Sequence, residues 1–217
     1  MLTLVAGTRL VHEIEIKRSR FITSLARTDT PEDARAFIDE VRGGFPDARH
    51  NCSAYLLHEP GRNPIQHSSD DGEPAGTAGV PMLDALRQSG VWNATAVVTR
   101  YFGGVLLGAG GLIRAYSTSV SEALALAPRA EVRSLTMLEC HLNPANAGRV
   151  EADLRSAGAV VTDVVWGRDV SLRIACDAAD VDVWKERLAS ATRGAGAFEP
   201  VGHTAVEVPV GRGGAVG

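Results

Sequence analysis

Residues 134–210 alternate predicted strands and helices in an order that few folds permit. The strand-like stretches are short and rich in apolar and β-branched residues, and they occupy 134–142, 159–167, 169–176 and 198–210. Between them, 143–158 and 177–194 carry apolar residues at helical spacing, and the first opens on Asn143–Pro144 and stops at Gly158. Strand, helix, strand, strand, helix, strand is the split βαβ order. The sequence therefore predicts a ferredoxin-like βαββαβ domain over 131–210.

The first 130 residues predict a separate α/β domain. Predicted strands occupy 9–25, 51–59 and 94–102, and predicted helices occupy 30–45, 81–88 and 112–127. A long polar loop is expected over 61–79, and Pro128 ends the last of these helices and begins a predicted linker over 128–133. The expected organisation is an α+β chain with domains at 1–130 and 131–210 and a flexible tail over 211–217.

Two glycine-rich stretches, 72–81 and 103–114, each lead toward a predicted helix. A turn of this kind can present unpaired backbone N–H groups beside the positive end of a helix, which suits an anion. Neither stretch is a Walker loop or a dinucleotide fingerprint. The alternative is structural: the glycines supply left-handed φ angles or permit close packing. The glycines and the threonine concerned are Gly76, Thr77, Gly79, Gly103, Gly104, Gly108, Gly110 and Gly111.

Three acids, Asp70, Asp71 and Glu73, crowd the start of the first glycine-rich stretch. Carboxylate oxygens are ligands for Mg²⁺, so a metal site is one interpretation. A second interpretation is a brace, in which Asp70 or Asp71 caps local N–H groups or pairs with Arg100 or Arg114 and fixes the loop. A third is an acidic turn that simply faces water. The sequence alone leaves these three open.

Other polar residues around these stretches suggest further chemistry. His50 and Cys52 have strand spacing that would place both side chains on one face, as a base and a nucleophile require. A hydrogen-bonded structural histidine and a buried core cysteine are the more common uses of such residues. Arg100 and Tyr101, together with Arg114 in the next helix, could bind a phosphate or stack a base. A basic run at 17–20 reads as a solvated edge or a phosphate contact. No zinc-ligand spacing occurs.

Composition excludes a general attraction for nucleic acid or anionic lipid. The net charge is −4, with 45% apolar and 22% charged residues, so any anion site must be local. Three scattered cysteines favour a reducing compartment over a disulfide framework. The N-terminus has no basic region of the signal-peptide type, and the longest charge-free apolar stretch, 101–113, is too short for a bilayer. A cytoplasmic protein without a membrane partner is expected.

Three segments in this order and spacing, "HNCSAY", "SSDDGEPAGTAGVPML" and "VVTRYFGGVLLGAGGLIRAYS", closely resemble the IMPACT family, in its bacterial two-domain form of the YigZ type. The motif resemblance covers about 18–128, and the βαββαβ region resembles the family's C-terminal domain by pattern. The resemblance to the family implies that the two domains have folds similar to domains IV and V of elongation factor G. The eukaryotic members look like translational regulators, but their partner does not carry over, and the resemblance brings no catalytic residue and no cofactor.

The expected function is therefore that of a non-enzymatic, translation-linked regulator. It would bind RNA, the ribosome or a translation protein through the glycine-rich loops of the N-terminal domain. The alternative is a magnesium-dependent enzyme that acts on a phosphorylated small molecule or nucleotide, with Asp70, Asp71 or Glu73 as metal ligands. The sequence leaves the oligomeric state open. The expected binding residues are His50, Asp70, Asp71, Glu73, Gly76, Thr77, Gly79, Arg100, Tyr101, Gly103, Gly104, Gly108, Gly110, Gly111 and Arg114.

Overall fold

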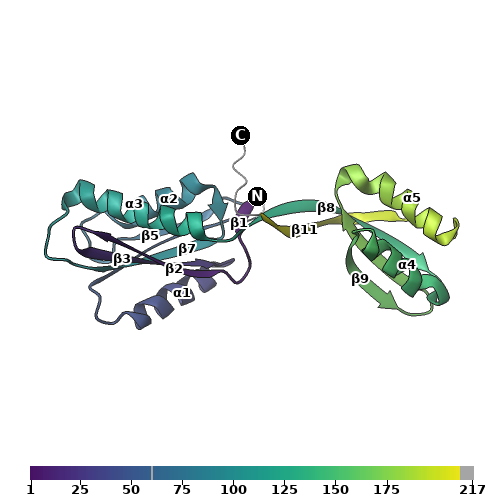
Figure 1. Ribbon diagram of the computed structural model, residues 1–217, viewed down its shortest axis with the longest axis horizontal. Helices are drawn as coiled ribbons and strands as arrows, with labels where there is room; N and C mark the ends of the chain where they lie inside the picture. The colour runs from purple at the N-terminus through teal and green to yellow at the C-terminus, as the bar shows by residue number, and fades with distance from the viewer. Residues whose placement is uncertain (60, 211–217) are drawn as a thin grey trace. The chain divides into compact units, whose positions relative to one another are not determined.

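The computed structural model describes residues 1–59 and 61–210, and contacts within the chain divide it into two compact units (Figure 1). The first unit comprises Met1–Glu131 together with the end of the chain from Glu207, and the second comprises Val132–Val206. The predicted mixed α+β class is confirmed. The tail predicted over 211–217 lies outside the described residues.

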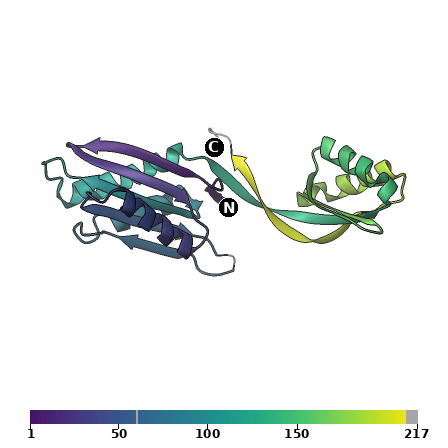
Figure 2. The ribbon, with the colours of Figure 1, turned by 90° about the horizontal axis from the view of Figure 1, so that it is seen from below.

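The first unit is built on a five-stranded antiparallel sheet. Its strands, in spatial order, are β2 (Arg9–Ile16), β3 (Ser19–Arg27), β7 (Ala94–Tyr101), β4 (His50–Leu57) and β5 (Ile65–Ser69). Three helices cover it: α1 (Pro31–Gly44), α2 (Gly79–Ser89) and α3 (Gly108–Leu126). Figures 1 and 2 show α1 on one face of the sheet and α2 with α3 on the other. The central strands are buried because both faces are covered.

The helix α1 forms where its sequence signals predicted. The Thr30 side chain caps it by accepting a hydrogen bond from the Asp33 N–H at 3.1 Å, and Pro31 occupies the first turn. Its apolar stripe, which includes Phe37 and Val41, packs against Tyr55 and other residues of the sheet. The stripe therefore closes one face of the sheet.

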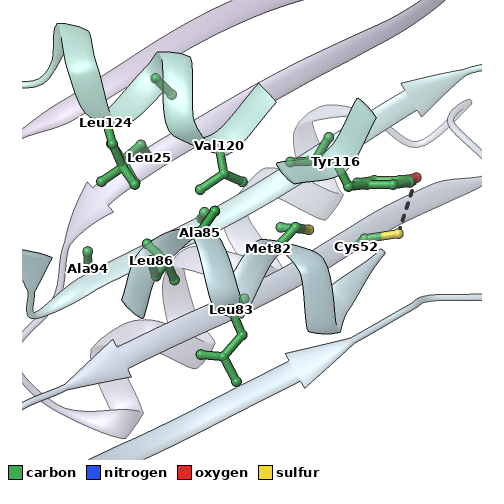
Figure 3. Close-up of a cluster of buried hydrophobic side chains, with 14 of the residues drawn as sticks. Leu25, Cys52, Met82, Leu83, Ala85, Leu86, Ala94, Tyr116, Val120 and Leu124 are labelled. Atoms are coloured by element: carbon green, nitrogen blue, oxygen red, sulfur yellow. Dashed lines mark hydrogen bonds between the residues drawn. The ribbon is translucent and has the colours of Figure 1, made fainter. Parts of the chain in front are cut away.

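The larger core lies between the sheet and the helices α2 and α3 (Figure 3). Met82 and Leu86 on α2 face Tyr116 and other apolar residues of α3, and all three named side chains are fully buried. Burying side chains of this size contributes about 1.5–3 kcal/mol each. Tyr116 also meets Phe21 edge-on, with ring centroids 5.2 Å apart. The Tyr116 ring therefore belongs to the core, while its hydroxyl points toward the loops at the end of the sheet.

A second, small group of strands in the first unit brings the beginning of the chain beside the segment that follows α3. The strand β1 (Leu2–Leu4) pairs in parallel with β6 (Val91–Trp92) and antiparallel with the beginning of β8 (Arg129–Leu142). The linker predicted over 128–133 contains the boundary between the two units, after Glu131, but from Arg129 onward its residues belong to the strand β8. Its Pro128 signal ends α3 correctly, but the chain then pairs at once with the edge that β1 offers, which satisfies its backbone hydrogen bonds.

The second unit has the predicted order of elements. After β8 come α4 (Pro144–Ser156), β9 (Val160–Trp166), β10 (Val170–Cys176), a short 3₁₀ turn (Ala178–Asp180), α5 (Val181–Thr192) and β11 (Glu199–Val210). The spatial order is β11, β8, β10, β9, and β10 runs antiparallel to both of its neighbours. This is the βαββαβ arrangement that the sequence predicts. Its core includes Leu138, Val150, Leu172 and Leu188.

Two further expectations need correction. The loop expected over 61–79 contains the strand β5, which pairs with Ser53–Leu57 of β4. Its sequence looked like a loop because an edge strand is half exposed and can be polar. The helix α3 begins at Gly108 rather than near residue 112, so Gly110 and Gly111 lie in its first turn. Among the described residues, no helix has the length and apolar character needed to cross a bilayer.

Candidate functional site

Four connections meet at one end of the five-stranded sheet. The antiparallel register pairs Ile16 with Ser19, His50 with Arg100, and Ser53 with Ser69. This end therefore carries the β2–β3 turn, the α1–β4 loop, the β5–α2 loop over 70–78 and the β7–α3 loop over 102–107. Every candidate binding residue lies in these loops or next to them.

Asp70 occupies the cradle of amides in the first glycine-rich loop. Its carboxylate accepts hydrogen bonds from the N–H groups of Gly76 at 2.7 Å, Ala78 at 3.0 Å and Gly79 at 2.8 Å. Burial raises the pKa of Asp70, but the three amide donors together outweigh it and hold the pKa below its usual value. The expectation of open amides in this loop is therefore wrong, because the protein supplies its own anion.

Close packing explains the other small residues of this loop. A Cβ on Gly79 would lie 2.6 Å from the backbone N of Ser69, so only glycine lets the start of α2 pass against β5. The Thr77 side chain is buried, and its hydroxyl donates to the carbonyl of Pro74 at 2.6 Å. These contacts are of the bracing kind, in which the loop is fixed by its own residues.

Asp71 ties the same loop to the beginning of β4. Its carboxylate accepts the Asn51 N–H at 2.6 Å and pairs with Arg42 at the end of α1. The His50 ring bonds through Nδ1 to the Asp71 carbonyl at 2.9 Å. His50 is thereby fixed in orientation by a backbone contact.

Glu73 forms a buried ion pair with Arg100. Oε1 of Glu73 accepts from Nη1 of Arg100 at 2.6 Å and from the Tyr116 hydroxyl at 2.8 Å, and the Glu73 and Arg100 side chains are only 3% and 8% exposed. The Arg100 guanidinium also lies over the rings of Phe21 and Phe102, 5.4 and 5.7 Å from their centroids. The bracing interpretation paired Arg100 with Asp70 or Asp71. The structure corrects the partner to Glu73.

The three acids therefore turn toward different partners. Asp70 faces backbone amides, Asp71 faces Arg42, and Glu73 is committed to Arg100. Over 1–59 and 61–210, no group of three or more His, Cys, Asp or Glu side chains gathers as a metal centre would require. The arrangement does not favour the Mg²⁺ interpretation.

Cys52 does not have the environment of a nucleophile. It is fully buried, and its thiol donates to the Asp70 carbonyl at 2.9 Å and lies 3.4 Å from the Tyr116 hydroxyl (Figure 3). Burial, followed by the nearby carboxylates, raises the pKa of Cys52 to about 12. Because the thiolate is the reactive form, the interpretation of His50 and Cys52 as a base and nucleophile is wrong.

The second glycine-rich loop is built differently. Gly103 is pressed against the β2–β3 turn, where a Cβ would lie 2.0 Å from the carbonyl carbon of Arg18, and its N–H donates to Ser19. Phe102 and Leu106 remain 55% and 83% exposed. No side chain caps the start of α3. Unlike the first loop, this loop has no internal carboxylate at its helix end.

Two pockets flank the 102–107 loop. The first, the Arg49 pocket, has a volume of about 430 Å³ and is lined by Asp47, Arg49, His50, Arg100, Tyr101, Phe102 and Leu106. The second, the Arg114 pocket, has a volume of about 550 Å³ and is lined by Ile16, Lys17, Leu107, Gly110, Gly111, Arg114, Ala115 and Thr118. The loop contributes side chains to both, so the two pockets border one surface.

Exposed cations surround these pockets. Lys17, Arg18, Arg49 and Arg114 are exposed and make no ion pair with any residue of 1–59 or 61–210. Most other arginines of the first unit are paired, for example Arg20 with Glu13 at 2.7 Å. Four unpaired cations at one end give this surface a local positive charge in a chain of net charge −4.

The structure thus separates the candidate residues into two groups. Those of the first loop brace the fold, and so do Arg100 and Gly103. The candidates that line the two pockets without such a role are Tyr101, Gly110, Gly111 and Arg114, together with His50. Sequence reasoning missed Arg49 and Leu106, which line the Arg49 pocket. The one signal for Arg49 was its place directly before His50, and Leu106 lies in the apolar run of residues 105–107, which no pattern marks as exposed.

The fold and the site define a two-unit α+β protein in which one end of an antiparallel sheet carries four loops, two pockets and four unpaired cations. The Impact N-terminal domain matches residues 17–124, and the Domain of unknown function (DUF1949) matches residues 140–195. Both matches fall within the units that the structure defines.

Relatives that match over most of their length indicate the same family. IMPACT family member YigZ of Escherichia coli (strain K12) is 44% identical over 182 residues, covering 83% of this chain and 88% of the relative. IMPACT family member YvyE of Bacillus subtilis (strain 168) is 39% identical, covering 84% and 83%. A crystal structure described as a hypothetical protein is 40% identical with a TM-score of 0.61, covering 92% and 96%. This chain belongs to the IMPACT family, so the resemblance found in its motifs is confirmed.

Proposed function

We propose that this protein is a non-enzymatic, translation-linked regulator that binds RNA, free or within the ribosome, through the basic end of its first unit. The observation that carries the proposal is the set of four exposed cations without ion-pair partners among residues 1–59 and 61–210: Lys17, Arg18, Arg49 and Arg114. We place its action in the cytoplasm, where ribosomes are found.

The charge distribution supports a phosphate-bearing ligand. Protein–RNA affinity arises largely from lysine and arginine side chains that neutralise phosphates and release counterions. Contacts of this kind position a nucleic acid without reading its sequence. Because the chain as a whole is acidic, binding would be confined to this end, and the remaining surface would repel the ligand.

Family membership supports the link to translation. The IMPACT motifs point in that direction, because they imply folds similar to domains of elongation factor G. The enzyme alternative has no supporting observation, because Asp70, Asp71 and Glu73 are committed to other groups of the protein and the Cys52 thiol is buried.

The test is the salt dependence of binding to fluorescently labelled RNA, measured by anisotropy. Each phosphate contact to single-stranded RNA contributes about 0.7 to the slope of log K against log salt. Arg114→Ala should lower that slope by about this amount. Arg100, an obvious choice from sequence, is buried and paired, so its loss would perturb the fold instead. Arg168, an exposed arginine of the second unit, is the matched control, and Arg168→Ala should leave the slope unchanged.

Two outcomes would contradict the proposal. One is the absence of salt-dependent association with RNA or ribosomal particles at low salt. The other is an equal effect of Arg114→Ala and Arg168→Ala, which would mean that the basic end is not the binding surface. Capture of ribosomal proteins from lysate that persists after nuclease treatment would identify a protein partner instead of RNA.

A further inference from the structure

The Arg49 pocket combines cations with exposed apolar surface. Its volume of about 430 Å³ falls in the range of small-ligand sites. Arg49, Arg100 and His50 supply positive or hydrogen-bonding groups, while Phe102 and Leu106 supply apolar surface. A ligand that matches both halves carries an anionic group and a flat apolar group.

Arg100 gives the pocket a rigid wall. The ion pair with Glu73 and the two rings that flank the guanidinium fix it in place. Its Nε is buried and has no hydrogen-bond partner among the described residues. Unpartnered buried donors are rare in native proteins and call for an explanation. The Arg100 Nε–H is thus a donor that the described residues leave unsatisfied.

The polar part of the pocket favours an anion over a cation. Arg49 is exposed and makes no ion pair within 1–59 or 61–210, and His50 uses Nδ1 for the Asp71 carbonyl, which leaves Nε2 as its second polar atom. Asp47 is the one acid among the lining residues, and its carboxylate accepts the Tyr101 hydroxyl at 2.8 Å. Because Arg100 is already paired with Glu73, Arg49 is the lining cation that an anionic group could contact.

The apolar part suits a planar ring. Phe102 is 55% exposed although its type is usually buried, and one face of its ring already meets the Arg100 guanidinium. Leu106 is 83% exposed beside it. An exposed aromatic ring next to cations is the arrangement with which proteins stack the bases of single-stranded RNA.

We infer that the Arg49 pocket binds one unstacked nucleotide, with its base against Phe102 and Leu106 and its phosphate at Arg49. The inference rests on the RNA binding proposed above and makes it more specific: the exposed cations hold the strand, and this pocket holds one base. It follows that single-stranded RNA binds more tightly than a duplex, whose bases are already stacked. The nucleotide could come from a strand or from the free pool, and the two sources differ in their dependence on Lys17 and Arg114.

The experiment uses the full chain and two RNA probes, a short single-stranded oligoadenylate with one central 2-aminopurine and a duplex of the same length. Phe102→Leu should weaken single-strand binding by about 5- to 100-fold, as expected for loss of one stacked base, and leave duplex affinity and the salt slope unchanged. The 2-aminopurine fluorescence should change on binding to the wild type and not to Phe102→Leu. Trp166, 59% exposed in the second unit, is the matched control, and Trp166→Leu should change neither affinity nor fluorescence.

Phe102 contacts Arg100, so Phe102→Leu could weaken binding by disturbing Arg100 rather than by removing a stacking surface. A second variant distinguishes these two causes. Leu106→Ala removes apolar surface from the same pocket on a side chain that is 83% exposed, and it should weaken the single strand selectively as well. Phe102→Tyr retains the ring and should restore single-strand affinity. Adenosine monophosphate, inorganic phosphate and adenosine are tested separately. Phe102-dependent binding of adenosine monophosphate without any binding of RNA would support the pocket with a free nucleotide as its ligand, and would refute the proposed function.

Other outcomes overturn the inference itself. If RNA binds with the expected salt slope but Phe102→Leu and Leu106→Ala leave single-strand affinity unchanged, the pocket is not a base site, although the proposed function stands. Equal losses on single strand and duplex would assign both residues to general packing. Binding of inorganic phosphate as tight as that of adenosine monophosphate would show an anion site without base recognition.

Discussion

The turn between β2 and β3 offers a test in which stability and binding should change in opposite directions. Lys17 and Arg18 form this two-residue turn, and both have positive φ angles, 47° and 65°. Turns of this type usually carry Asn-Gly, because a side chain at positive φ costs about 1–2 kcal/mol per residue. Two cations therefore occupy the tip of the hairpin at the expense of stability, which suggests a functional reason.

The double substitution Lys17→Asn with Arg18→Gly should relieve most of this strain. Asparagine and glycine both tolerate positive φ, and the added flexibility of glycine in the unfolded chain offsets about 0.4–1 kcal/mol of the gain. A net stabilisation of about 1 kcal/mol follows, or about 2–4 °C in Tm. Loss of two phosphate contacts should lower the salt slope for single-stranded RNA by about 1.4. For a fourfold rise in salt, the fold-loss of affinity should therefore be about seven times smaller in the variant than in the wild type.

Thermal unfolding by circular dichroism and RNA anisotropy at several salt concentrations measure the two effects. Arg193 is the control, because it is an exposed arginine of the second unit that also has a positive φ, 55°. Arg193→Gly should stabilise the second unit and leave the salt slope unchanged. A simultaneous fall in stability and binding would show that the hairpin was damaged. A rise in Tm with an unchanged slope would refute the claim that these cations contact phosphate.

Five further substitutions test the braces and the glycine packing at this end of the sheet. Asp70→Asn should lower the free energy of unfolding by about 1–3 kcal/mol at pH 7. Because the folded-state pKa of Asp70 lies below its unfolded value, this stabilisation is present above about pH 4 and is lost as the pH falls through the folded pKa, so urea unfolding of wild type and variant should converge in acid. Glu73→Ala leaves Arg100 buried without its partner and should cost about 3–5 kcal/mol in urea unfolding, and Arg100→Met added to it should restore part of the loss. Gly103→Ala should destabilise by about 1–3 kcal/mol or more because its Cβ would clash with backbone, whereas Gly110→Ala, whose Cβ meets nothing within 4 Å in the helix, should stabilise by about 0.5–1 kcal/mol in the same thermal assay.

Local signals in the sequence predicted most of the fold. The helix α1 follows from its Thr30 cap and apolar stripe, and the second unit follows from its order of elements. The failures share a physical cause, since β5 and the start of β8 are strands only because a neighbouring strand offers an edge for hydrogen bonding. That edge is assembled from residues far away in the sequence, and no local pattern reports it.

The sequence marked the segments that meet at the candidate site, but it did not indicate which contacts their residues make. Proximity of the two glycine-rich stretches follows from the register of β4, β5 and β7, which the sequence does not contain. The acids were recognised as a possible brace, but their partners depend on tertiary contacts, and Arg100 pairs with Glu73 across 27 positions. The exposure of Phe102 and Leu106 was equally hidden, because apolar residues in a loop are indistinguishable by sequence from residues of a core.

The contrast between the two glycine-rich loops carries a more general argument. Both place small residues before a helix and so resemble an anion cradle in sequence. In the first, Asp70 lies six to nine positions ahead of the amides it binds, and its carboxylate fills the cradle. In the second, the residues from Phe102 to Gly111 include no acid, so the protein has no local anion for the start of α3. An acid within reach of a glycine-rich turn thus argues for a self-contained brace, and its absence argues for an external anion. Asp70→Asn should accordingly destabilise the protein without changing the salt slope for RNA, whereas Arg114→Ala should change the slope without destabilising it, and an exchange of these two results would refute the distinction.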